Sequence, residues 1–132
     1  MKKELMKVFV IDPEKGVAQA QEIDNSKGDL GAVSQIIGTL PSPVCYRIKG
    51  ERFVFLFDID SLSNDFLLTS IISSEGEEAR GPVVICQEGP NSKGELDYIG
   101  LDDEDVETIK QSLAPVYADD CVVYMVSVDD DY

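Results

Sequence analysis

The chain has 132 residues and a net charge of −15, with 43% hydrophobic and 28% charged residues. This length and composition are typical of a soluble globular protein with a hydrophobic core, and they argue against wholesale disorder. The chain contains no histidine, which excludes Ser-His-Asp and Cys-His catalysis, histidine-ligated zinc and a histidine general base.

Two strands joined by a tight turn are expected at the start of the chain. Residues 5–11 are mostly apolar, and residues 17–23 alternate polar and small apolar side chains, a pattern typical of two antiparallel strands. The sequence between them, Asp-Pro-Glu-Lys-Gly at 12–16, is typical of a turn, and Gly16 is expected to adopt a positive φ.

A helix and a hairpin are expected next. Ser26 is a suitable N-cap, Gly38 is a natural end, and one helical face is apolar, with Leu30, Val33, Ile36 and Ile37. Lys49-Gly50-Glu51 then separates two strand-like segments, 44–48 and 52–59, as in a compact hairpin. Because both faces of 52–59 are apolar, we expect this strand to be central in the sheet.

The second half of the chain continues with strands and helices. The sequence pattern first predicts a short helix at 64–74, with Asn64 near its start, and a solvated loop at 73–81. It then predicts strands at 82–88 and 95–99, a helix starting at Asp102, and a strand at 121–128. Residues 128–132 are expected to form a flexible acidic tail. The fold class predicted for the single domain 1–132 is α+β: a largely antiparallel sheet of about six to seven strands, with two or three helices packed mainly on one face.

The cysteines and apolar runs indicate the compartment. Cys45, Cys86 and Cys121 are widely spaced in strand-like segments, so we expect reduced, buried thiols and neither a disulfide framework nor a metal knuckle. The longest apolar runs are too short to cross a bilayer. Lys7 and Asp12 interrupt any apolar region of a signal peptide near the start. We therefore expect a cytoplasmic protein.

The negative charge is concentrated in one part of the chain. Residues 1–57 hold eight Lys or Arg and seven Asp or Glu, whereas residues 58–132 hold three basic and nineteen acidic residues. A region with this much negative charge repels nucleic-acid backbones and membrane surfaces. Direct binding to nucleic acid or to a membrane is therefore not expected. The favoured partner is a basic surface on another protein, such as a nucleic-acid-binding or defence protein.

The sequence Leu-Asp-Asp-Glu-Asp-Val-Glu-Thr-Ile at 101–109 is the most acidic helical segment. Asp102 and Asp105 have the spacing of a helix capping box, and Leu101 and Val106 have that of a hydrophobic staple. The run lacks the alternating acids and central glycine of an EF-hand loop, so no metal site is expected. It is interpreted either as a helix start with a solvated face or as a partner-binding surface, and the candidate partner-binding residues are Asp103, Glu104, Glu107, Asp129, Asp130 and Asp131.

A second acidic motif follows the apolar strand 52–59. Asp58-Ile59-Asp60 resembles the first motif of haloacid-dehalogenase phosphotransferases, in which the first aspartate is the nucleophile. Ser61-Leu62 stands where that family has Gly-Thr, and no later lysine motif follows, so a strand end with a turn is the favoured interpretation. The chain also lacks the glycine-rich motifs that bind nucleotide phosphates, and no cofactor is expected.

Four blocks occur in a familiar order: KVFVIDPEKG, GAVSQIIG, GPVVICQEG and LDDEDVETI. Together they resemble a family of small uncharacterised proteins, catalogued as a domain of unknown function, that phages, plasmids and integrated elements of gut bacteria carry. The resemblance covers about residues 7–113, although 50–80 departs from the family's glycine-lysine turn and proline-asparagine-arginine segment. It carries no catalytic residues, and it implies a mobile-element setting in which small acidic proteins bind host machinery.

These observations favour a non-enzymatic, acidic protein-binding module of a mobile genetic element. Such a module would act as an inhibitor that presents a nucleic-acid-like acidic surface to a host or defence protein. One alternative is an immunity-type or regulatory protein for a single cognate basic partner. Another is a small-ligand binder or carboxylate-based enzyme that uses Asp58 and Asp60. The oligomeric state stays open.

Overall fold

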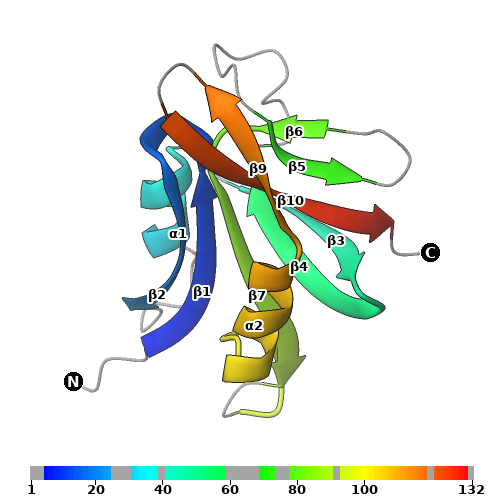
Figure 1. Cartoon of the computed structure of the whole chain (residues 1–132). Coiled ribbons are helices and arrows are strands. Elements are labelled where there is room, and N and C mark those ends of the chain that lie inside the picture. The colour runs from blue at the N-terminus through cyan, green and yellow to red at the C-terminus, as the bar shows by residue number, and fades with distance from the viewer. Residues whose placement is uncertain are drawn as a thin grey trace.

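A computed structural model describes the following residues of the chain: 5–24, 31–38, 41–58, 69–73, 78–90, 93–118 and 121–130. Within them the chain forms ten strands, two short α-helices and a 3-10 turn (Figure 1). The first elements are β1 (Leu5–Asp12), η1 (Pro13–Lys15), β2 (Val17–Asp24), α1 (Gly31–Ile37), β3 (Ser42–Ile48) and β4 (Glu51–Phe57). The later elements are β5 (Thr69–Ser73), β6 (Glu78–Arg80), β7 (Val83–Pro90), β8 (Leu96–Ile99), α2 (Asp103–Gln111), β9 (Leu113–Ala118) and β10 (Cys121–Asp130).

All of these strands belong to one sheet. Its strand order is β2-β1-β7-β4-β3-β10-β5-β6, with β8 paired to β7 and β9 paired to β10. Among the described strands, β10 and β5 pair in parallel, and the other pairs are antiparallel. The sheet is therefore mixed, although most of its ladders are antiparallel.

Strand β10 folds the sheet over onto itself. Its last residues, Asp129 and Asp130, pair with β3, and Val126–Val128 pairs with β5 on the opposite side. The same strand contacts β2 and η1, which lie at the other end of the strand order. Figure 1 shows β9 and β10 crossing the face of β7 and β4. The two parts of the sheet therefore enclose the larger core between them.

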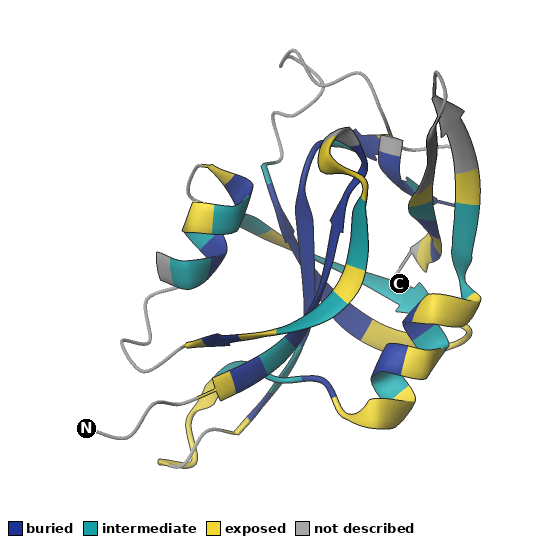
Figure 2. Ribbon diagram, turned by 60° about the vertical axis from the view of Figure 1, so that its left-hand side comes forward, coloured by how far each residue is buried: buried dark blue, intermediate teal, exposed yellow. Residues whose placement is uncertain are grey.

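The two helices lie on opposite faces of the sheet (Figure 2). Helix α2 contributes Val106 to the larger core, which also contains Phe55 of β4. Helix α1 contributes Val33 to the smaller core, which also contains Val54 of β4. Because successive residues of a strand point to opposite faces, β4 supplies side chains to both cores.

The expected fold class is wrong in both strand number and helix placement. The sheet has ten strands rather than six to seven, and the helices pack on opposite faces rather than mainly on one. The additional strands are β5, β6 and β9. The sequence predicts a helix at 64–74 and a loop at 73–81, but 69–73 and 78–80 form β5 and β6. Pairing and burial, rather than local pattern, decide the conformation of such short strands.

The end of the chain also differs from the expectation. Strand β10 continues through Asp130, so residues 128–130 belong to a paired strand rather than to a flexible tail. Strand β9 contains Pro115, which weakens any strand prediction from sequence. The proline is tolerated because, among the described strands, β9 pairs only with β10.

Several local predictions are confirmed. Gly16 has a φ of 69° and its N–H donates to the carbonyl oxygen of Pro13. The expected hairpin forms between β3 and β4, but its turn has two residues, Lys49 and Gly50, with φ values of 52° and 84° as in a type I′ turn. Glu51, expected in the turn, is the first residue of β4. Strand β4 is central, between β3 and β7. The proposed N-cap Ser26 lies outside the described residues.

The cysteines differ in their exposure. Cys86 is buried and Cys45 is half-buried, and both are free thiols; the side chain of Cys121 lies outside the described part. Val54 pairs with Cys45 on one side and with Cys86 on the other. Two strand spacings of about 4.8 Å therefore separate the two cysteine backbones, which is beyond the range of a disulfide bond.

The buried thiol of Cys86 predicts a loss of stability at high pH. Burial, reinforced by the charge of Glu88, raises the pKa of Cys86 from 9.0 to about 12. Between these values the unfolded chain loses the thiol proton but the folded chain keeps it, so the free energy of unfolding falls by about 1.4 kcal/mol per pH unit. Urea denaturation at pH 8 and at pH 10 measures this effect. Between the two pH values, the free energy of unfolding should fall by about 1.4 kcal/mol less in Cys86→Ala than in the wild type. Equal losses in the two proteins would show that this thiol does not resist ionisation.

Candidate protein-binding surface

Helix α2 begins with the capping box that its sequence predicts. The backbone N–H of Asp105 donates to Oδ1 of Asp102 at 2.7 Å, and the backbone N–H of Asp102 donates to Oδ2 of Asp105 at 3.2 Å. Leu101 and Val106, on either side of this cap, are both buried. Burial is also the main cause that raises the pKa of Asp105 above its usual value. These two acids therefore serve the helix start.

Replacing Asp102 by alanine should remove the cap. We expect a loss of about 0.5–2 kcal/mol in the free energy of unfolding, because the N–H of Asp105 loses its acceptor. Asp102→Asn is the matched control, since it removes the same charge but keeps a side-chain oxygen, and its loss should be clearly smaller. Urea denaturation of the two variants measures the difference. Equal destabilisation of both would indicate that charge, rather than the hydrogen bond, stabilises this helix start.

Contacts with β1 hold the start of α2 in place. The backbone N–H of Leu101 donates to the carbonyl oxygen of Lys7 at 2.7 Å. Gly100 lies so close to β1 that a Cβ atom at this position would be 2.9 Å from the backbone nitrogen of Lys7. The absence of a side chain at Gly100 therefore permits the close approach that positions the helix.

Asp103 is engaged by the same strand. Nζ of Lys7 donates to Oδ1 of Asp103 at 2.8 Å, although the Asp103 side chain is 94% exposed. This hydrogen bond and its charge raise the pKa of Lys7 and lower the pKa of Asp103. An exposed ion pair of this kind contributes little to stability. It nevertheless neutralises a carboxylate that the sequence assigns to partner binding.

Glu104 and Glu107 lie on the exposed side of α2. They are three residues apart, and Gln111 follows four residues after Glu107, so the three side chains share one helix face. Among the described residues, neither glutamate carboxylate forms an ion pair. Gln111 accepts a hydrogen bond from Nζ of Lys49, which joins this face to the β3–β4 hairpin. We call Glu104, Glu107 and Gln111 the outer face of α2.

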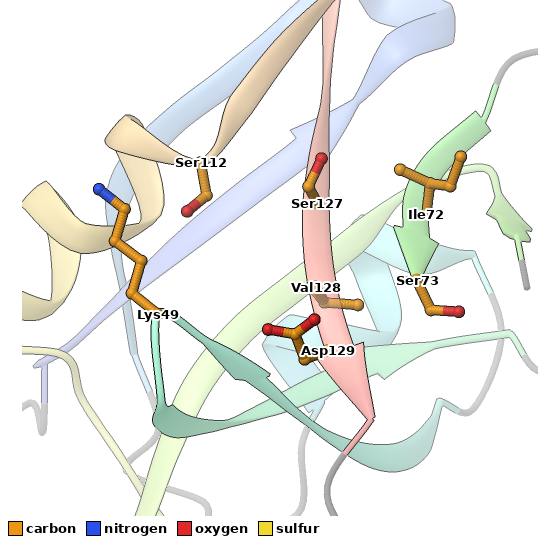
Figure 3. Close-up of a pocket in the computed structure, with 7 residues that line it drawn as sticks. All are labelled: Lys49, Ile72, Ser73, Ser112, Ser127, Val128 and Asp129. Atoms are coloured by element: carbon orange, nitrogen blue, oxygen red, sulfur yellow. The ribbon is translucent and has the colours of Figure 1, made fainter. Parts of the chain in front are cut away.

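A pocket of about 440 Å³ lies beyond Gln111, where the hairpin, the end of α2, β10 and β5 meet (Figure 3). Its lining residues are Lys49, Ile72, Ser73, Ser112, Ser127, Val128 and Asp129. The backbone N–H of Ser127 donates to the carbonyl oxygen of Ser112 at 3.1 Å. Strand β10 pairs with β9 up to Val126 and with β3 from Asp129 onward. The interval between these two ladders leaves room for the pocket.

The structure brings some of the predicted site residues together and separates others. Glu104 and Glu107 lie on the outer face of α2, and Asp129 lies in the pocket at the far end of that helix. Asp103 is held by Lys7. Asp130 is in β10 opposite Tyr46, but its side chain is not described, and Asp131 lies outside the described residues.

The carboxylates of the alternative hypothesis lie elsewhere. Asp58 directly follows β4 and is half-buried, and it does not line the described pocket. Asp60 lies outside the described residues. A pocket that contains both carboxylates stays a prediction.

Sequence reasoning does not find the rest of the pocket. Lys49 has a sequence signal only as part of a hairpin turn, and Ser112 and Ser127 have none. These residues meet because β10 pairs with both β5 and β3. Such long-range pairings have no local signature, since each strand pattern is compatible with many partners.

The described parts of the chain hold no group of three or more cysteine, aspartate or glutamate side chains arranged to bind a metal ion. In the same residues no helix is long and apolar enough to cross a lipid bilayer. Comparison with known proteins adds no further constraint, because no family model, curated protein or solved structure matches the chain.

Proposed function

We propose that the chain is a non-enzymatic protein-binding module that docks the outer face of α2 on a basic surface of another protein. The observation that carries the proposal is the pair of exposed carboxylates, Glu104 and Glu107, which no ion pair neutralises among the described residues. The other acids at this helix start already have partners, since Asp102 and Asp105 form the cap and Asp103 binds Lys7.

The charge of the whole chain supports the same proposal. A net charge of −15 attracts a basic protein over a distance and accelerates its association, especially at low ionic strength. Nucleic-acid-binding proteins present lysine and arginine to phosphates, so they are the class of partner whose surface best complements this one. In a mobile element, such binding would inhibit a host or defence protein.

Removing the two exposed charges should weaken partner binding without unfolding the protein. Glu104→Gln/Glu107→Gln preserves side-chain shape and leaves the capping box intact, and exposed charges contribute little to stability. We expect a protein captured from host lysate by the wild type, then purified, to associate with the double variant more slowly. The wild-type association rate should also fall as salt is added. Binding kinetics at two salt concentrations measure both effects.

A matched control separates this surface from net charge alone. Glu22→Gln in β2 and Glu107→Gln in α2 each remove one exposed carboxylate, so the two variants have the same net charge. The proposal requires that Glu107→Gln slows association more than Glu22→Gln does. If the double variant associates as fast as the wild type at low salt, the partner surface lies elsewhere.

A further inference from the structure

Two exposed residues of β10 line the pocket beside α2. Ser127 and Asp129 are exposed, whereas Val128 between them is buried, as expected for alternate residues of a strand. Their backbones are therefore separated by about 7 Å with no outward side chain between them. Figure 3 shows Lys49 and Ser112 on one side of β10, and Ile72 and Ser73 on the other.

The polar groups around these two residues suit a cationic ligand. Asp129 supplies a carboxylate that, among the described residues, forms no ion pair. Ser112 and Ser127 add hydroxyl groups from two different elements. These three acceptors suit the three rotatable donors of an ammonium group, whereas a planar guanidinium pairs with the carboxylate alone, through its two oxygens.

The walls of the pocket suit an aliphatic chain next to that cation. Ile72 contributes apolar surface, and Lys49 lines the pocket with its own stem. The ammonium group of Lys49 is bound to the side-chain oxygen of Gln111, and in Figure 3 it points away from Asp129. The charge of Lys49 is therefore directed toward α2 rather than toward the free carboxylate.

We infer that this pocket binds a lysine side chain of the partner, with the ammonium group at Asp129 and the four-carbon stem against Ile72. The inference rests on the proposed function, because the pocket is continuous with the outer face of α2 through the Lys49–Gln111 hydrogen bond. Glu104 and Glu107 then attract the basic surface, and the pocket anchors one residue of it. Asp129 thereby acquires a role distinct from that of the helix acids.

An NMR titration of the full chain with a capped amino acid tests this assignment. The probe is N-acetyl-lysine amide, and the readout is the backbone amide shifts of Ser112, Ser127 and Asp129. We expect saturable shifts at these amides. Asp129→Asn should weaken binding roughly two- to fivefold, as expected for one exposed ion pair. Glu22→Gln in β2 removes the same charge outside the pocket and should leave the affinity for this probe unchanged.

Three further capped amino acids define the ligand chemistry. The norleucine derivative has a similar aliphatic stem without the ammonium group, and it should bind more weakly than lysine. The arginine derivative should also bind more weakly, and the glutamate derivative should not shift these amides. Absence of saturable lysine binding, equal binding of norleucine or arginine, preference for glutamate, or an unchanged affinity in Asp129→Asn would each overturn the assignment. The capture experiment with Glu104→Gln/Glu107→Gln would still decide the proposed function separately.

Discussion

Replacing Phe55 by alanine is expected to lower the free energy of unfolding by about 3–5 kcal/mol. Phe55 is fully buried in the larger core, and its ring meets that of Tyr46 edge to face, with centroids 5.1 Å apart. The substitution loses both the apolar burial and this ring contact, and it leaves a cavity between the two parts of the sheet. Because small domains are stable by about 5–15 kcal/mol, the variant should lose a large part of its stability.

Urea denaturation followed by circular dichroism measures this loss. Leu5→Ala serves as the control, because Leu5 lies in the same sheet but is 60% exposed, and its loss should stay within about 0.5 kcal/mol. A Phe55→Ala loss as small as that of Leu5→Ala would mean that the curled sheet does not enclose Phe55. The result therefore tests the crossing of β10 over the sheet as well as a single side chain.

Replacing Gly100 by alanine should cost about 1–3 kcal/mol by overpacking. The added methyl group would lie 2.9 Å from the backbone nitrogen of Lys7 and 3.4 Å from its carbonyl oxygen. A backbone cannot rotate away as a side chain does, so the segment before α2 must shift. We expect the Leu101–Lys7 hydrogen bond to weaken and the ion pair between Lys7 and Asp103 to lengthen with it.

Gly89→Ala is the matched control for Gly100→Ala. Its added methyl group would meet Cδ1 of Ile99 at 2.8 Å, but the end of a flexible side chain can move aside. The urea midpoint should therefore fall further in Gly100→Ala than in Gly89→Ala. An NMR spectrum of each variant would report whether the amides of Lys7 and Leu101 change. Equal losses, with both amides unchanged, would contradict the close approach of Gly100 to β1.

Predictions from the sequence succeed where a few neighbouring residues contain the whole interaction. Asp102 and Asp105 form the predicted capping box because the two acids cap each other within one helical turn. Gly16 adopts the predicted positive φ because only local backbone sterics are involved. For the same reason the expected hairpin forms at Lys49–Gly50, although Glu51 belongs to β4 rather than to the turn.

Predictions fail where the conformation of a segment depends on distant partners. Residues 69–73 form β5 rather than a helix, and their ladder partners are β6 and β10. The parallel pairing with β10 joins residues that are far apart in the chain, so no local pattern indicates it. The placement of α1 and α2 on opposite faces likewise follows from the apolar side chains on both faces of β4. The sequence indicates that both faces are apolar, but it does not indicate which helix covers which face.

The candidate surface likewise depends on both local and long-range interactions. The sequence by itself determined that Glu104 and Glu107 are outward acids on a capped helix, because helical periodicity and capping depend on adjacent turns. Only the tertiary structure decided that Lys7 neutralises Asp103, and that Asp129 shares a pocket with Lys49 and Ser112. Those contacts exist because β1, β4 and β10 bury their apolar faces in one core, which brings distant segments together. Such shared burial depends on the whole chain.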